Sequence, residues 1–318
     1  MKMLVPILLF VLGLALLIKG GDWFVDGAEG IAHRFHMPEL LIGATVVSIG
    51  TTLPEVMVSA QGAMVGNGSI AFGNAVGSVI CNTALISAIT LVVSPAKVNR
   101  KTILLPTAAF FIAAAYYCYN AYAYGAFSLH SGLVLLSMFV VYMAVTVLQM
   151  KRNPDPFPAE EAAVETSLTA DLVKLVGGAV VIAVGARLLV DNATVIATAL
   201  GVPESVIALT LVALGTSLPE LVTAITSLIK GHGALSLGNI IGANLFNLVL
   251  VSGAAITINP FDLSSASATS MVVDIPLMLA VMLLLTLPAL IKQKLYRWQG
   301  AALLVTYFAY CGFLFLQG

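Results

Sequence analysis

The sequence predicts an all-α integral membrane protein with ten transmembrane helices arranged as two inverted five-helix repeats. The prediction depends on an extreme composition, on ten long apolar runs and on an internal repeat. Of the 318 residues, 60% are hydrophobic and only 9% are charged, against about 25% charged residues in ordinary globular domains. Lipid cannot satisfy backbone polar groups, so a chain that spans it must form helices or a closed barrel. The long apolar runs approach the roughly 20 residues that a helix needs to cross a bilayer, and helices are therefore predicted.

Ten spans result when the chain is divided at its polar and turn-rich breaks. The first apolar run could be mistaken for a signal peptide. It is followed by Gly20-Gly21-Asp22-Trp23 and not by a small-residue cleavage site, so we interpret it as the first helix. The predicted spans are 3–21, 40–62, 71–94, 103–119, 128–149, 172–191, 205–228, 235–258, 271–291 and 298–316.

A polar linker separates the first five spans from the last five. Its proline-rich and acidic composition predicts a short connector that is disordered or lies at the surface. We therefore expect a first repeat over 1–150, the linker over 151–170, and a second, inverted repeat over 171–318.

The basic residues predict the orientation of the chain, because short cytoplasmic loops retain Lys and Arg. Loops after odd-numbered spans carry basic residues, whereas loops after even-numbered spans carry none; Lys2 and Arg187 are the exceptions near the other side. The linker is therefore expected in the cytoplasm, and both termini are expected to be extracellular or periplasmic. The basic residues on the expected cytoplasmic side are Arg34, Lys97, Arg100, Lys101, Lys151, Arg152, Lys230, Lys292, Lys294 and Arg297.

The charge balance and the cysteines point to no further partner. A net charge of -1 gives no indication of nucleic acid or of an acidic partner, and we expect neither. Cys81, Cys118 and Cys311 lie far apart, each in an apolar run, and we interpret them as packing residues. Membrane lipid is the expected surrounding, no cofactor is expected, and we expect a monomer.

The chain contains an internal repeat with a constant offset. The segment HMPELLIGATVVSIGTTLPEVMVSA at 36–60 aligns without gaps with GVPESVIALTLVALGTSLPELVTAI at 201–225, which places Glu55 on Glu220, 165 residues later. The same offset places Asn82 on Asn247. Five spans per half is an odd number, so the second half enters the membrane from the opposite side. Inverted repeats of secondary transporters hold their substrate near mid-membrane, at the interface of the repeats.

Glu55 and Glu220 lie inside predicted spans, at the ends of GTTLPE and GTSLPE. A carboxylate inside a membrane costs roughly 2.5–3.5 kcal/mol on insertion scales, so neighbouring groups must offset that cost. Each Glu follows a proline, which frees a helical carbonyl. Carboxylate, hydroxyl and carbonyl oxygens suit Ca²⁺ or Na⁺, and two glutamates match the charge of one Ca²⁺ while also being able to hold Na⁺ or protons. Each segment contributes two hydroxyl residues: Thr51 and Thr52, and Thr216 and Ser217.

Two asparagines extend this pattern on the third and eighth spans. Asn82 and Asn247 lie four residues after Ser78 and Ala243 in GNAVGSVICN and GNIIGANLFN, so each pair shares a helix face. A simpler interpretation is that the GxxxG spacing only permits close helix packing and that each Asn bonds to a neighbouring helix. The doubled arrangement favours a site over packing alone.

At these residues the sequence resembles the calcium/cation antiporter superfamily, and specifically its microbial sodium/calcium exchanger branch. The resemblance covers essentially the whole chain and implies a multi-pass protein of a prokaryotic cell membrane that transports Ca²⁺ and Na⁺. It also implies a compact bundle of eight helices and two long tilted helices, the first and sixth, that slide past the bundle to switch access. The ion ligands implied by the resemblance are Glu55, Glu220, Thr51, Thr52, Thr216, Ser217, Ser78, Asn82 and Asn247, with backbone carbonyls near Ser48 and Ala213.

Two positions depart from the family pattern. Ala243 stands where relatives often have Ser, which removes one hydroxyl, and Asn247 stands where potassium-dependent and some archaeal relatives have Asp. The missing charge argues against potassium co-transport. The proton-coupled branch usually carries its acid in a GNxxE context, whereas each Glu here follows Leu-Pro, which favours sodium coupling.

The expected function is therefore secondary active exchange of cytoplasmic Ca²⁺ for external Na⁺ by alternating access. Exchange of Ca²⁺ or another divalent cation for H⁺ is the alternative, because two Glu can equally release protons. Two acids could also serve an intramembrane hydrolase or a passive cation channel. The sequence shows neither a substrate groove nor a water path, and we do not expect an enzyme.

Overall fold

The computed structural model describes residues 3–95, 97–152, 167–200, 213–263 and 270–317. Almost all of these residues are helical, and nine helical stretches among them are long and apolar enough to cross a membrane. The prediction of a helical membrane protein is thereby confirmed. Most of the predicted linker and residues 205–212 of the seventh predicted span lie outside the described residues.

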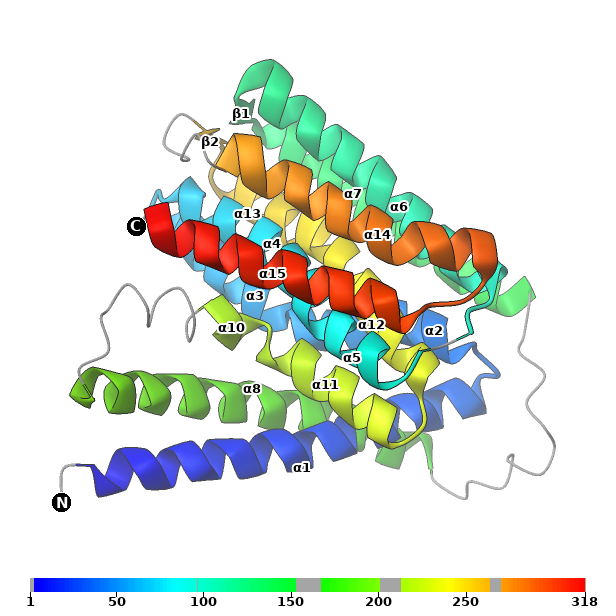
Figure 1. Cartoon of the computed structure of the whole chain (residues 1–318). Coiled ribbons are helices and arrows are strands. Elements are labelled where there is room, and N and C mark those ends of the chain that lie inside the picture. The colour runs from blue at the N-terminus through cyan, green and yellow to red at the C-terminus, as the bar shows by residue number, and fades with distance from the viewer. Residues whose placement is uncertain (1–2, 96, 153–166, 201–212, 264–269, 318) are drawn as a thin grey trace.

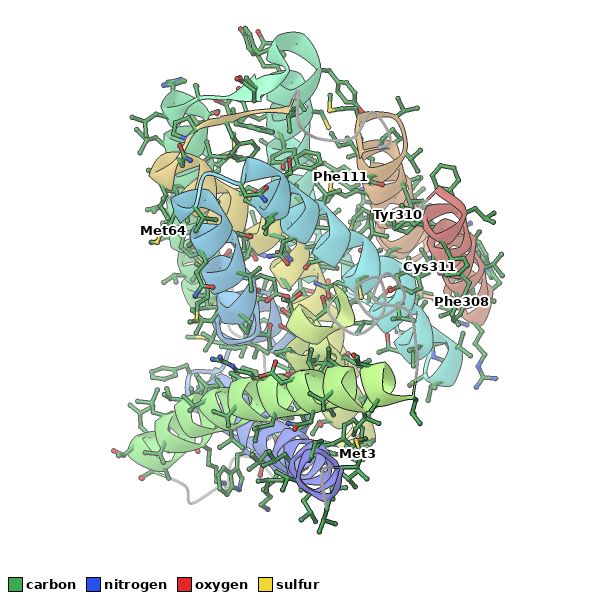
Figure 2. The ribbon with its side chains drawn as sticks, turned by 90° about the vertical axis from the view of Figure 1, so that its left-hand side faces the viewer. Met3, Met64, Phe111, Phe308, Tyr310 and Cys311 are labelled. Carbon is green, nitrogen blue, oxygen red and sulfur yellow. The ribbon has the colours of Figure 1, made fainter. Side chains whose placement is uncertain are left out.

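Two long helices, α1 (Leu4–Arg34) and α8 (Leu168–Ala199), lie side by side along one side of the molecule (Figure 1). Figure 2, turned by 90°, shows the pair again at the foot of the other helices, with Met3 at the start of α1. The sequence-based end of the first helix near residue 21 is wrong. The helix continues to Arg34, with 31 residues in all, because the polar break at Gly20-Gly21 is packed against other helices rather than exposed.

Glycines on α1 set the distance between these two helices. A Cβ at Gly13 or Gly20 would lie 2.8 or 2.9 Å from the backbone nitrogen of Leu189 or Ile182 in α8. The contacts run in opposite directions along the two chains, so the helices are antiparallel. Glycine contacts of this kind are the usual means of close helix packing in membranes.

The remaining elements form a bundle above this pair (Figure 1). The segments that carry the expected site are nearest its centre. In the most apolar part of the helical stretch that begins at Gly233, 83% of the residues are buried, whereas in the last helix the share is 17%. Phe308 of that last helix lies at the outer edge of the bundle and is exposed (Figure 2). The bundle consists of α2 (Glu39–Ile42), η1 (Gly43–Val47), α3 (Ser48–Met64), α4 (Gly68–Cys81), η2 (Asn82–Ile86), α5 (Ser87–Val93), α6 (Arg100–Tyr119), η3 (Asn120–Tyr124), α7 (Leu129–Arg152), α10 (Ala213–Thr216), α11 (Leu218–Ile229), α12 (Gly233–Phe246), η5 (Asn247–Val251), α13 (Ser252–Ile258), η7 (Ser270–Asp274), α14 (Ile275–Lys292) and α15 (Arg297–Gln317).

A two-stranded antiparallel ribbon closes one end of the bundle. Its strands are β1 (Ala126–Phe127) and β2 (Phe261–Asp262), which lie directly after η3 and shortly after α13. Phe127 and Phe261 face each other with ring centroids 5.6 Å apart. The ribbon therefore joins the two halves of the chain at that end.

The internal repeat is visible in the element boundaries. The series α4, η2 and α5 begins at Gly68 and ends at Val93, and the series α12, η5 and α13 repeats every boundary 165 residues later. In both series a π-helical turn begins at the asparagine singled out in the sequence, Asn82 or Asn247. Single π-helical turns inside α-helices occur frequently at functional sites. The opposite orientation of the two halves in the membrane stays a prediction.

Candidate cation site

Glu55 of α3 and Glu220 of α11 lie deep in the protein. Both side chains are 0% exposed, and the two carboxyl groups are close enough to interact electrostatically. None of their four oxygens has a hydrogen-bond partner in the described protein. Buried polar groups are normally paired, and an unpaired buried carboxylate is costly. The structure therefore brings together the two acids that the sequence selected, in an arrangement that suits cation binding.

The two glutamates occupy different local structures. Pro54 lies inside the continuous helix α3, whereas in the second half the helix is interrupted at Ser217, so that Glu220 falls in the first turn of α11. A proline has no N–H, so each proline leaves the carbonyl four residues earlier without its helical donor. The amino end of α11 also favours a negative charge, because its first N–H groups are directed toward it.

The predicted hydroxyl and amide residues surround these acids with buried oxygen atoms. Thr51, Thr52, Ser78 and Ser217 are buried, as are both asparagines; Thr216 is partly exposed. More than half of the unpartnered buried polar atoms in the described part of the chain belong to the predicted ligands. The predicted ligands with such atoms are Thr52, Glu55, Asn82, Ser217, Glu220 and Asn247.

Ser48 and Ala213, the two expected carbonyl donors, begin α3 and α10. The Ser48 hydroxyl is engaged inside the protein, where its one proton has two carbonyl acceptors within reach, Gly43 at 2.7 Å and Asn239 at 3.0 Å. Ala243, the departure from the family pattern, is fully buried at the position that corresponds to Ser78. The hydroxyl groups around the acids are consequently more numerous on the first half than on the second.

The pair of long helices covers the two acidic segments. A small hollow of about 10 Å³, no larger than one water molecule needs, is bordered on one side by α1 and α8, through Phe24 and Ala179 among others, and on the other side by Thr51, Pro54 and Pro219. The Phe24 ring would be only 2.9 Å from a Cβ at Gly50. Any movement of this pair relative to the bundle would therefore change what covers the acidic segments.

The glycines of the second GxxxG segment lie in close contact with the first half of the chain. A Cβ at Gly238 would collide with the carbonyl oxygen of Leu40, and a Cβ at Gly242 would collide with the Ser48 hydroxyl. For these two glycines the close-packing interpretation is correct.

Two further asparagines near the acids were not predicted as site residues. Asn239 Oδ1 accepts a hydrogen bond from the Thr51 hydroxyl at 3.1 Å, and Asn74 Nδ2 donates to the backbone carbonyl of Glu55 at 3.2 Å. Both asparagines follow a glycine, and the repeat offset places one on the other. That correspondence was the signal in the sequence that could have identified them.

Charged side chains also join α1 to the bundle. Asp26 of α1 is paired with Lys230 at the end of α11. Nearby, His232 lies between Glu29 of α1 and Glu39 of α2. These contacts concentrate near the ends of the helices, away from the two buried acids.

A helical membrane protein with repeated buried acids, surrounded by hydroxyl and amide oxygens, has the construction of a cation transporter. The family model described as "Sodium/calcium exchanger protein" matches residues 5–148 and 171–316. The chain belongs to this family of exchangers and is a transporter, not an enzyme.

Whole-length relatives agree with this assignment. An uncharacterized membrane protein of Methanocaldococcus jannaschii is 36% identical over 94% of both chains. The sodium/calcium exchanger MaX1 of Methanosarcina acetivorans is 31% identical over 98% of this chain and 99% of its own. The solved structure of the sodium-calcium exchanger NCX_Mj is 34% identical and superposes with a TM-score of 0.79 over 96% of this chain and 97% of that chain.

Proposed function

We propose that this protein exchanges Ca²⁺ for Na⁺ across the membrane by secondary active transport, with both ions bound between the two halves. The observation that carries the proposal is the pair Glu55 and Glu220, both fully buried and without hydrogen-bond partners in the described protein. Their two negative charges match one Ca²⁺, and Ca²⁺ prefers six to eight oxygen ligands of the kinds gathered here. The names of MaX1 and NCX_Mj support Na⁺ as the counter-ion.

The ligand set that we propose combines side-chain and backbone oxygens from both halves. Their helices come into contact around the acids, since α3 meets α11, α12 and η5, and α11 meets η2. The ligands are Glu55, Thr51, Thr52, Ser78 and Asn82 of the first half, Glu220, Thr216, Ser217 and Asn247 of the second half, and the backbone carbonyls near Ser48 and Ala213.

Transport by this site requires alternating access. We infer that α1 and α8 move together against the bundle, because they pack on each other through backbone contacts and cover the acidic segments. The tight contact of Gly238 and Gly242 with α2, η1 and α3 supports a closed route on that side of the site. With the orientation expected from the basic loops, that side is the cytoplasmic one, both termini face outside, and the 151–170 linker is cytoplasmic.

We also propose that the chain consists of two inverted repeats. Residues 1–150 and 171–318 are the two inverted repeats, and the element boundaries repeated at an offset of 165 residues support this division. The transported ions then lie at the interface of the repeats, as in other secondary transporters with inverted repeats.

Flux measurements in reconstituted vesicles test the coupling. Proteoliposomes loaded with Na⁺ and placed in Na⁺-free buffer are expected to accumulate radiolabelled Ca²⁺, and a K⁺ gradient alone is expected to have no effect. Ca²⁺ uptake that ignores the Na⁺ gradient and follows an imposed pH gradient would instead establish H⁺ exchange. Passive equilibration without uphill accumulation would contradict an antiporter.

Substitution of the acids tests the site itself. Glu55→Gln and Glu220→Gln keep the side-chain shape but remove one negative charge each, so both are expected to abolish Ca²⁺ transport while the protein still folds in detergent. Asp191→Asn is the matched control, because Asp191 is exposed and pairs only loosely with Arg187 at 3.6 Å. Wild-type flux in either glutamine variant would refute the proposed site.

A further inference from the structure

We propose that Asn239 is a positioning residue: its amide oxygen accepts a hydrogen bond from the Thr51 hydroxyl and so directs the Thr51 oxygen lone pairs toward the transported cation. The inference depends on the proposed function, because it assumes that Thr51 is a cation ligand. Asn239 itself is not proposed to touch the ion.

The geometry defines one good acceptor for the Thr51 proton. Asn239 Oδ1 lies 3.1 Å from Thr51 Oγ1, whereas the alternative acceptor, the backbone carbonyl of Ser48, is at 3.5 Å. The single proton of the Ser48 hydroxyl has its nearest acceptor at the Gly43 carbonyl, at 2.7 Å, and the Asn239 backbone oxygen and Oδ1 are more distant alternatives at 3.0 and 3.3 Å. All three side chains are buried, so water does not compete for these groups.

The chemistry of a hydroxyl ligand explains why the acceptor matters. A threonine hydroxyl has one proton and two lone pairs, and it binds a cation only through the lone pairs. If its proton pointed toward the ion, the O–H dipole would repel the positive charge. Thr51 lies beside Glu220 and lines the hollow between the long helices and the acidic segments, so its free lone pairs can face that region. Glu220 competes for the Thr51 proton, because its carboxyl group lies near the same hydroxyl. The Glu220 oxygens have no hydrogen-bond partner in the described protein, whereas Asn239 Oδ1 accepts from Thr51 at 3.1 Å, so the geometry favours Asn239.

Glycines on both sides of Asn239 allow this contact. Gly238 and Gly242 bring α12 so close to Leu40 and Ser48 that no Cβ fits between the two helices. Asn239 Nδ2 is buried without an acceptor in the described protein, which is a cost that good packing alone does not explain. The close helix contact therefore holds the amide oxygen of Asn239 against α3.

The corresponding asparagine of the first half has a different use. Asn74 donates through Nδ2 to the Ser59 hydroxyl at 2.9 Å and to the Glu55 carbonyl, both on α3 of its own half. The repeat offset places Ser48 on Ala213 and Ser59 on Ala224, neither of which has a hydroxyl. Asn74 therefore has no counterpart of Ser48 beside it. Asn239 likewise has no counterpart of Ser59. Asn74 is the matched control for Asn239.

A double-mutant cycle between Asn239 and Thr51 tests the inference. Asn239→Leu removes the acceptor at similar volume, and Thr51→Val removes the hydroxyl at similar shape. Each single substitution is expected to weaken Ca²⁺ binding roughly 3- to 10-fold, the range of one hydrogen bond. In the Thr51→Val background, Asn239→Leu is expected to add less than about 2-fold, because the group it acts through is already gone. Asn74→Leu should combine multiplicatively with Thr51→Val.

Ca²⁺ binding is measured directly in detergent with radiolabelled Ca²⁺, and thermal unfolding is measured on the same samples. Multiplicative effects of Asn239→Leu and Thr51→Val would overturn the inference, since a purely structural role of Asn239 gives that result. If Asn239→Leu does not fold, the double-mutant cycle is carried out with Asn239→Ala instead, and the same outcomes support or overturn the inference. Wild-type protein that fails to bind Ca²⁺ would instead overturn the proposed function, so the two failures are distinguishable.

Discussion

The charged contact between α1 and the bundle predicts a pH dependence of stability. His232, directly before α12, places Nδ1 2.9 Å from Glu39 Oε1 and Nε2 3.1 Å from Glu29 Oε2. The hydrogen bonds to these two carboxyl groups raise the pKa of His232 to about 10. His33 of α1 also contacts Glu29, at 3.5 Å. On the adjoining turn, Lys230 forms ion pairs with Asp22 and Asp26 of α1 and not with the two carboxyl groups that contact His232.

The sign and size of the effect follow from that raised pKa. In the unfolded chain the imidazole titrates near 6.5, so its protonation stabilises the folded protein fully below about pH 6.5, and the contribution is lost as the pH rises through about 10. Full burial would make such a shift worth several kcal/mol. The side chains of His232, Glu39 and Glu29 are 16%, 23% and 31% exposed, so solvent screening reduces the expected contribution to about 1–2 kcal/mol.

The assay compares thermal unfolding of wild type and His232→Gln in detergent across the pH range. The variant is expected to unfold at a lower temperature near pH 7, and the difference is expected to vanish above about pH 10, where wild-type His232 is neutral. His130→Gln, at the start of α7 and away from this cluster, is the control and should show no such pH-dependent difference. An equal difference at neutral and strongly alkaline pH would refute the ionic contribution, and no difference at either pH would refute the contact.

Two further predictions concern packing and ion binding. Gly242→Ala is expected to destabilise the protein by about 1–3 kcal/mol in thermal or denaturant unfolding, because its Cβ would collide with Ser48. A loss within about 0.5 kcal/mol, as is usual at an ordinary surface position, would contradict this close contact. Ca²⁺ at about 100 times its Kd should stabilise wild type by about 2.7 kcal/mol but leave Glu220→Gln unchanged, and a wild-type shift in that variant would argue against binding at Glu220.

The position of the two acids could be predicted because the repeat contains the information twice. A membrane span tolerates few carboxylates, so Glu55 and Glu220 were conspicuous, and the constant offset placed them as counterparts. The same offset relates Asn82 to Asn247, and a π-helical turn begins at each of them, which the sequence did not predict. Local sequence and repeat pattern agreed at the two acids, so their prediction needed no knowledge of the packing.

The length of α1 could not be predicted in the same way. Gly20, Gly21 and Asp22 have the composition of a turn, and a helix interior disfavours glycine by about 1 kcal/mol. In the folded protein, α8 packs on Gly20, and Lys230 pairs with acids of α1 beyond this point. Tertiary contacts with α8 and Lys230 thus offset the local preference for a break in the helix. The sequence alone does not identify these contacts.

The repeat also conceals differences that the structure brings out. Asn74 and Asn239 are counterparts in sequence, yet one donates to its own half and the other accepts from the opposite half. The cause lies in two serines, Ser48 and Ser59, whose counterparts are alanines. The loss of a hydroxyl at Ala243 acts in the same direction, so the first half supplies more of the hydroxyl groups near the acids. The proposed exchange of Ca²⁺ for Na⁺ would then take place in an asymmetric site, although both halves of the chain share one repeated frame.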